Sequence, residues 1–209
     1  MGHAAVVLAA GASRRLGRPK QLLTIDGESL LRRAARLALS SGAARVLVVL
    51  GADGERLRAE LSGLAVEVVV NPDWQQGLSS SLRAAADALA GDALAGDGFG
   101  GSVLVLGCDQ PALRSEHLLD LVAGAATVSG ACAATVHSQA LGVPALIAAD
   151  LWREATALHG DRGFGAALAR QPEGAVWRLV APELELDLDT PGDVEVAVAR
   201  GWIDAVGVA

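Results

Sequence analysis

The sequence predicts an α/β fold in which a mostly parallel sheet is covered by helices on both faces. Short continuous apolar runs alternate with segments rich in Ala, Leu and Arg, whose apolar residues recur every three or four positions. Aromatic residues form only 3% of the chain and tyrosine is absent, so the core must be built from Ala, Val and Leu. This alternation predicts right-handed crossovers and places ligands at the carboxyl ends of the strands.

The first half of the chain carries the clearest elements. Continuous apolar runs predict strands that are buried on both faces, at residues 4–8, 46–50, 66–70 and 103–106. Segments with helical spacing lie between these runs, at residues 30–39, 54–61 and 78–89.

The second half of the chain has a less regular pattern. Residues 131–136 and 143–148 are expected to form two strands around a turn at residues 137–142. Residues 176–180 predict a further strand, and residues 194–199 predict a closing helix.

Length and composition limit the class of protein. With 209 residues the chain is expected to form one domain, residues 1–209, with two domains as the alternative. The net charge of -7 argues against a nucleic-acid partner, because phosphate backbones are bound by concentrated positive charge. The glycine-rich segment 91–101 predicts a mobile surface loop.

The chain is expected to be cytoplasmic. No apolar stretch approaches the roughly 18 residues that span a bilayer, and the N-terminus lacks the layout of a signal peptide. Cys108 and Cys132 are isolated and have no C-x-x-C spacing, which fits a reducing compartment and argues against a zinc site. The sequence leaves open a single disulfide between them.

The glycine-rich loop after the first predicted strand is the strongest candidate for a binding site. Gly11 and Gly17 flank Ser13, Arg14 and Arg15, so backbone amides, a hydroxyl group and positive charge converge as a phosphate chain requires. Lys20 ends this segment and is the only lysine beside sixteen arginines. Its compact ammonium suits a crowded phosphate chain better than a planar guanidinium does. The loop matches neither the P-loop nor the G-x-G-x-x-G pattern, and an ordinary solvated turn is an equal alternative.

Carboxylates occupy two further segments. Asp109 directly follows a buried strand, where a carboxylate can hold Mg2+ together with substrate phosphates. Asp187 and Asp189 point to the same side of an extended segment that precedes a helix start. The alternatives are a turn or capping role for Asp109 and an acidic, solvated helix entrance for the other two.

Polar residues also follow the third predicted strand. Asn71 comes first, and Ser79, Ser80 and Ser81 stand at the start of the next predicted helix. Their hydroxyl groups and the exposed amides can bind an anion or the edge of a base. The serines serve equally well as plain helix caps.

Taken together, these segments resemble the nucleotidyltransferases of the molybdenum-cofactor type. The first loop, from Leu8 to Lys20, has the order L-A-A-G-x-S-x-R-x-G-x-x-K, which is similar to the signature of that family. Further motifs along almost the whole chain resemble its molybdenum cofactor cytidylyltransferase branch: PKQLL at 19–23, NPDWQQGLSSSL at 71–82, CDQP at 108–111, GDRG at 160–163 and DLDTP at 187–191.

The resemblance implies a Rossmann-like nucleotidyltransferase domain that uses Mg2+. In the implied reaction, the terminal phosphate of a molybdopterin-type acceptor attacks the α-phosphorus of CTP and releases pyrophosphate. The cytosine dinucleotide form of the cofactor would be the product, and a recipient molybdoenzyme would be a further partner. Chemistry of this kind asks the protein mainly for positioning and charge neutralisation.

The resemblance also implies roles for individual residues. Arg15 and Lys20 would neutralise phosphate charge, while Asp109 and Asp187 would hold the metal, with Asp189 as a third carboxylate. The loops at residues 160–163 and 137–142 would face the pterin. The residues implied to contact the nucleotide belong to the first loop and to the segment after the third strand: Leu8, Ala9, Ala10, Gly11, Ser13, Gly17, Lys20, Asn71, Ser79, Ser80 and Ser81.

Two positions depart from the wider family pattern. Leu16 stands where the family usually has methionine, a volume-conserving change that should cost little. Ala10 stands where the GTP-using branch has glycine, and its methyl group beside the base is expected to disfavour a purine.

Four alternatives remain at this point. The first is another nucleotide, such as GTP, or another acceptor on the same fold. The methylerythritol-phosphate cytidylyltransferases resemble the first loop, but they use a second functional lysine that this chain lacks. A nicotinamide-dependent reductase on this scaffold is disfavoured by the missing G-x-G-x-x-G pattern. A carrier that only holds the cofactor would not need Lys20, Asp109 and Asp187.

Overall fold

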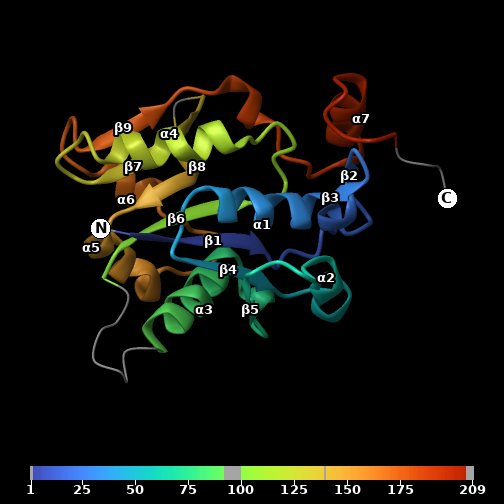
Figure 1. Cartoon of the computed structure of the whole chain (residues 1–209), viewed down its shortest axis with the longest axis horizontal. Helices are drawn as coiled ribbons and strands as arrows, with labels where there is room; N and C mark the ends of the chain where they lie inside the picture. The colour runs from blue at the N-terminus through green and yellow to red at the C-terminus, as the bar shows by residue number, and fades with distance from the viewer. Residues whose placement is uncertain (1, 92–99, 139, 206–209) are drawn as a thin grey trace.

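A mixed sheet organises the chain in a computed structural model that describes residues 2–91, 100–138 and 140–205. Within these residues the larger sheet has seven strands in the order β5-β4-β1-β6-β8-β7-β9 (Figure 1). Most of the glycine-rich segment 91–101, at residues 92–99, lies outside the described residues. The strands are β1 (His3–Ala9), β4 (Arg45–Leu50), β5 (Glu67–Val70), β6 (Ser102–Gly107), β7 (Cys132–His137), β8 (Ala140–Ile147) and β9 (Val176–Leu179).

The sheet is parallel except at β8. β1 pairs in parallel with β4 and β6, β4 with β5, and β7 with β9, whereas β8 runs antiparallel to both β6 and β7. The predicted α/β fold with a mostly parallel sheet is therefore confirmed.

Helices cover both faces of this sheet, as the sequence predicts. One face packs against α1 (Leu30–Ser40), α2 (Gly54–Glu60) and α4 (Ser115–Ala125). The other packs against α3 (Leu78–Ala90), α5 (Ala149–Trp152) and α6 (Gly165–Ala169). None of the helices in the described part of the chain combines the length and apolarity needed to span a bilayer.

The central strand shows why the apolar runs are continuous. Ala5, Val7 and Ala9 of β1 join the core on one face, while Ala4 and Val6 join the core on the opposite face. A strand that is covered on both sides has no solvent-facing positions, so no polar residue interrupts it.

A smaller cluster lies at the C-terminal end of the fold. It joins α7 (Pro191–Ala199) to the short strands β2 (Thr24–Ile25) and β3 (Glu28–Ser29) through Leu30, Leu188 and Val194 (Figure 1). Short 3-10 turns complete the fold: η1 (Lys20–Leu22), η2 (Trp74–Gln76), η4 (Arg153–Ala157) and η5 (Pro182–Glu185).

Three expectations from the pattern need correction. The apolar run at residues 66–70 predicts a strand that is buried on both faces, but β5 lies at the edge of the sheet and its Val70 is 53% exposed. Residues 140–142 belong to β8 and pair with β7, so the turn expected at 137–142 is shorter than predicted. Helix α4 was not expected at all. The apolar residues of α4 pack on the sheet. In the sequence, Glu116, Asp120 and Gly124 stand among these apolar residues, so their spacing of three and four positions is harder to recognise.

The strand order creates one place for a ligand. The chain moves outward from β1 to β4 and β5, and then returns to β6 on the other side of β1. Connections therefore diverge between β1 and β6, and a crevice forms at the carboxyl ends of these two strands. The loops that follow Ala9 and Gly107 both start there.

Neighbouring leucines of α4 test this packing. Leu118 is fully buried, whereas Leu119 is 47% exposed. We expect Leu118→Ala to lower the free energy of unfolding by about 2–5 kcal/mol, because it removes buried methyl groups and leaves a cavity. Leu119→Ala should change it by less than about 1 kcal/mol. Urea denaturation of both variants measures the difference, and equal losses would contradict this arrangement of α4.

Candidate active site

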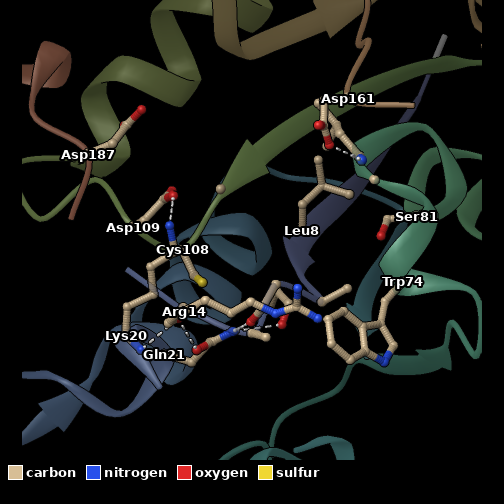
Figure 2. A pocket seen from close by; sticks show the side chains of 18 of the residues that line it. Leu8, Arg14, Lys20, Gln21, Trp74, Ser81, Cys108, Asp109, Asp161 and Asp187 are labelled. Carbon is tan, nitrogen blue, oxygen red and sulfur yellow. Dashed lines mark hydrogen bonds and ion pairs between the residues drawn. The ribbon is translucent and has the colours of Figure 1, made fainter. Parts of the chain in front are cut away.

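A cavity of about 480 Å³ opens at the carboxyl ends of β1 and β6. Figure 2 shows Lys20, Asp109 and Asp187 on one side of Leu8, with Trp74, Ser81 and Asp161 on the other. The lining comes from six separate parts of the chain: residues 8–21, 74–81 and 107–109, and the single residues Val143, Asp161 and Asp187. The sequence-predicted residues among them are Leu8, Ala9, Ala10, Gly11, Ser13, Lys20, Ser81, Asp109 and Asp187.

Ion pairs of Lys20 connect distant segments beside the cavity. Its Nζ lies 2.6 Å from Asp109 Oδ2 and 2.8 Å from Asp189 Oδ1, and only 14% of its side chain is exposed. Burial by itself lowers the pKa of Lys20, but the two carboxylates outweigh it and raise the pKa above its ordinary value. The ammonium is therefore charged throughout the physiological pH range.

The predicted carboxylates separate into two groups. Asp187 lines the cavity, and burial together with the charge of Asp109 raises its pKa well above the ordinary value, against the opposing effect of Lys20. Asp189 instead bonds to both Lys20 and Arg15 and does not line the cavity.

The donor set fits a magnesium ion only in part. Asp109 and Asp187 supply hard oxygen atoms, and a cation beside them would favour the ionised form of Asp187. No group of three or more His, Cys, Asp or Glu side chains in the described residues could hold a metal ion. Mg2+ is usually bound by one or two carboxylates together with substrate phosphates. Asp109 and Asp187 can therefore supply the protein ligands, and a bound nucleotide would supply the remaining oxygen atoms.

Arg15 lies outside the cavity lining. Its guanidinium is held 2.7 Å from Asp189 Oδ2, and 71% of its side chain is exposed. The next residue back, Arg14, does line the cavity and lies 5.8 Å from the centre of the Trp74 ring. The sequence assigns the positive charge of the loop to Arg14 and Arg15 together and a catalytic role to Arg15 alone, whereas the structure brings Arg14 to the cavity beside Trp74.

The loop after β1 presents bare backbone to the cavity. A Cβ atom added at Gly11 would meet no protein atom within 4 Å, so space remains above its backbone. Gly17 does not line the cavity and has φ +77, a conformation that turns the chain toward η1. Leu16 is buried in the hydrophobic cluster with Leu188. A methionine, which the family usually has at this position, is of similar volume.

Gln21 is a site residue that the sequence analysis did not identify. It is 1% exposed, and its Nε2 donates to the carbonyl oxygens of Ala9 (3.0 Å) and Gly11 (2.7 Å). Ser13 Oγ lies 3.4 Å from Gln21 Oε1 and accepts a bond from the Lys20 backbone N–H. One buried amide thus holds the loop against η1. The sequence signals for it are its position next to Lys20 and its place in the PKQLL motif at 19–23.

The polar segment after β5 is mostly turned inward. Asn71 is 2% exposed, and its Nδ2 donates to the hydroxyl groups of Ser80 and Ser81. Asn71, Ser79 and Ser80 do not line the cavity, whereas Ser81 does. These bonds hold the entrance of α3 in place, so the first role of Asn71 in this structure is to position that helix.

Two glycines are required by close packing at the site. A Cβ at Gly107 would overlap the carboxylate of Asp109, and a Cβ at Gly77 would overlap Asp161 and Gly160. Asp161 lines the cavity, and its Oδ1 lies 3.4 Å from the backbone nitrogen of Leu78. The GDRG segment is therefore carried to the entrance of α3.

The cysteines are free thiols, so the alternative of a disulfide is not supported. Burial and the nearby charge of Asp109 raise the pKa of Cys108 to about 12. Although Cys108 lines the cavity, its thiol stays protonated and is a poor nucleophile.

Sequence comparison relates this site to known proteins. Residues 5–175 match the MobA-like NTP transferase domain. Nicotine blue oxidoreductase from Paenarthrobacter nicotinovorans is 36% identical over 175 residues, which cover 80% of this chain and 81% of that protein. Molybdenum cofactor guanylyltransferase from Rhodobacter capsulatus is 31% identical over 207 residues, which cover 96% of this chain and 97% of that protein.

Solved structures show the same fold. Rv0371c from Mycobacterium tuberculosis H37Rv has a TM-score of 0.76 at 26% identity, over 95% of this chain and 98% of that chain. Another structure of Rv0371c, in complex with manganese, has a TM-score of 0.70 at 24% identity, over 95% of this chain and 99% of that chain.

Replacement of Gln21 tests its role in holding the loop. We expect Gln21→Met to lower the free energy of unfolding by about 1–3 kcal/mol, because buried carbonyl groups lose their donor. Gln171→Met, which removes a single long bond of 3.4 Å to Ala167, should stay within about 0.5 kcal/mol of the parent. Urea denaturation measures both. If the two variants are equally stable, Gln21 does not hold the loop.

Proposed function

Because the chain belongs to the MobA-like NTP transferase family, and is thus a nucleotidyltransferase, we propose that it transfers CMP from CTP to the terminal phosphate of a molybdopterin-type acceptor. Pyrophosphate is the second product. The observation that carries this proposal is the partly buried Lys20–Asp109 pair beside a glycine-rich loop, on the edge of the sheet where ligands bind.

Lys20 is the group proposed to neutralise charge as the phosphoanhydride bond breaks. Its ammonium is charged, largely shielded from water and held at the cavity wall by carboxylates from two other segments. An electrostatic contact gains strength in such a place, because less water screens it. The loop at Gly11 to Ser13 offers backbone amides for the remaining phosphate oxygens.

Asp109 and Asp187 are the residues proposed to hold Mg2+. The ion would neutralise the charge of the triphosphate and hold it in line for attack. The manganese complex of Rv0371c agrees with a divalent cation on this fold, and the assignment to this chain rests on its own pair of carboxylates.

The choice of CTP rests on Ala10. This residue lines the cavity and also belongs to the core cluster under the sheet, and its methyl group is proposed to occupy space that a glycine would leave for a purine. The guanylyltransferase from Rhodobacter capsulatus supports the molybdopterin-type acceptor, since it matches along 96% of this chain.

A second candidate function comes from the other relative. Nicotine blue oxidoreductase is 36% identical over 80% of this chain, which favours an oxidoreductase on this scaffold. The retained Lys20–Asp109 pair favours nucleotidyl transfer, because hydride transfer does not need a charged lysine between carboxylates. Incubation with NADH or NADPH and measurement of its oxidation separates the two.

Substitution of Lys20 tests the proposed chemistry. We expect Lys20→Ala and Asp109→Ala to reduce Mg2+-dependent pyrophosphate release from CTP by about 100-fold or more, in the presence of the acceptor. Lys20→Arg keeps the positive charge but replaces the compact ammonium with a planar guanidinium. Its rate of pyrophosphate release should therefore be at least about tenfold below that of the parent. Thermal melts establish that each variant is folded.

Arg18→Ala is the matched control for these variants. It removes one positive charge from the same loop, but Arg18 is exposed and does not line the cavity. Its rate should stay within about threefold of the parent. Robust oxidation of NADH or NADPH with no nucleotide turnover in the parent would reject the proposal in favour of the reductase.

Ala10→Gly tests the basis of nucleotide choice. Removal of the methyl group should raise the relative use of GTP over CTP by about tenfold, because a purine then gains space next to the loop. Initial rates with both nucleotides measure the ratio. An unchanged ratio would show that Ala10 does not select the base.

A further inference from the structure

Gln110 is a buried neighbour of the two carboxylates proposed to hold the metal ion. It follows Asp109 directly in the sequence and is only 4% exposed. Unlike Asp109 and Asp187, it does not line the cavity. Any part that its side chain plays in the reaction must therefore act through the residues that it binds.

Residues 109 and 110 hold the chain on both sides of Asp187. Gln110 Nε2 donates to the carbonyl oxygen of Leu184 at 2.9 Å, on the N-terminal side of Asp187. The carbonyl oxygen of Asp109 accepts a bond of 3.0 Å from the backbone N–H of Leu188, on the C-terminal side. The segment that carries one carboxylate is thus tied at both ends to the short segment that carries the other.

The same amide also holds a neighbouring wall of the cavity. Gln110 Nε2 lies 3.3 Å from the carbonyl oxygen of Val143 in β8, and Val143 lines the cavity. That carbonyl oxygen also lies 2.8 Å from His137 Nε2. Through one nitrogen atom, Gln110 therefore joins β8 to the segment before Asp187.

The orientation of this amide leaves one atom unpaired. Within the part of the chain that the structure describes, Gln110 Oε1 is the one buried side-chain oxygen or nitrogen atom without a hydrogen-bond partner. A flipped amide would bring this oxygen against the carbonyl oxygens of Leu184 and Val143, which accept bonds and cannot donate them. An unpaired buried acceptor destabilises a fold, so its presence calls for a reason. The reason that the structure offers is the need for a donor at this point.

The amide also acts on the carboxylate of Asp187 itself. Burial and the charge of Asp109 raise the pKa of Asp187, while Lys20 and a hydrogen bond from the side chain of Gln110 oppose that rise. Gln110 is therefore close enough to restrain the side chain of Asp187 as well as the backbone before it.

We propose that Gln110 is a positioning residue, which holds Asp187 in place beside Asp109 for a divalent cation that arrives with the nucleotide. The proposal rests on the proposed function, since the triphosphate supplies the remaining ligands. Mg2+ demands a near-ideal arrangement of oxygen atoms, so a displaced carboxylate binds it less well. Loss of a partner that orients a metal ligand typically lowers metal affinity by about 10-fold to 100-fold.

Titration calorimetry of the full chain with CTP, in Mn2+ and in EDTA, tests this role. The ratio of the two affinities is the gain from Mn2+. Gln110→Met has a similar volume but no donor. We expect it to lower the gain by at least about tenfold, and to leave the affinity for metal-free CTP within about threefold of the parent. An unchanged gain would overturn the proposal, and so would a parent protein whose affinity for CTP does not depend on Mn2+.

A double-mutant cycle shows whether Gln110 acts through Asp187. Asp187→Asn by itself should lower the gain from Mn2+ by at least about tenfold, because the carboxylate is lost. Gln110→Met in the Asp187→Asn protein should lower it by no more than about twofold further, because the residue that it positions no longer binds the metal. Losses that multiply would mean that Gln110 acts independently of Asp187, which would also overturn the proposal.

Two control variants separate positioning from a general loss of stability. Leu118→Ala removes buried contacts of α4, and Gln171→Met removes another partly buried amide. Neither residue lines the cavity, so both variants should keep the gain from Mn2+ within about twofold of the parent. A loss in Leu118→Ala equal to that in Gln110→Met would count against positioning. If a thermal melt shows that Gln110→Met is unfolded, Gln110→Asn keeps an amide that is one methylene group shorter, and the same loss is expected.

The binding and turnover assays fail independently. Pyrophosphate release in the parent, with an unchanged gain from Mn2+ in Gln110→Met, would overturn the positioning role and leave nucleotidyl transfer intact. A gain that Gln110→Met abolishes, in a parent protein that releases no pyrophosphate, would overturn nucleotidyl transfer and leave Gln110 as a positioning residue of a site for a metal–nucleotide complex.

Discussion

The ion pairs of Lys20 are the interaction on which the site depends. They join the loop after β1 to the end of β6 through Asp109 and to the segment before α7 through Asp189. Asp109 and Asp189 lie 89 and 169 residues from Lys20 in the sequence. Removal of the lysine would leave Asp109 without its cation and Asp189 paired with Arg15 alone, so the repulsion of both carboxylates with Asp187 would increase.

Weaker bonds hold the same three segments in register. The Leu188 backbone N–H donates to the Asp109 carbonyl at 3.0 Å, and Gln110 Nε2 donates to the Leu184 carbonyl at 2.9 Å. Thr190 and Asp193 cap α7 with reciprocal bonds, which fix the direction of the chain before that helix. The charged end of the cleft is therefore held by hydrogen bonds to backbone groups of the segment before α7.

The fold was largely predictable because its pattern is local. A strand that is buried on both faces must be a continuous apolar run, and β1, β4 and β6 all lie where such runs occur. The order of the strands and the antiparallel direction of β8 depend on which edges meet in space. Helix α4 is not predicted from the sequence because charged residues and a glycine interrupt its apolar spacing. Its contacts with the sheet stabilise it in the folded protein.

The sequence by itself determined the α/β class, the position of the glycine-rich loop and the candidates Lys20 and Asp109, since each depends on residue types in a short segment. Only the tertiary structure decided which of the candidate residues line the cavity and which bind other side chains. It directed Asp187 to the cavity and Asp189 to Lys20, and it showed that buried Gln21 holds the loop. The physical reason is that a side chain forms its ion pairs and hydrogen bonds with whatever the fold brings near it, and those partners lie far away in the sequence.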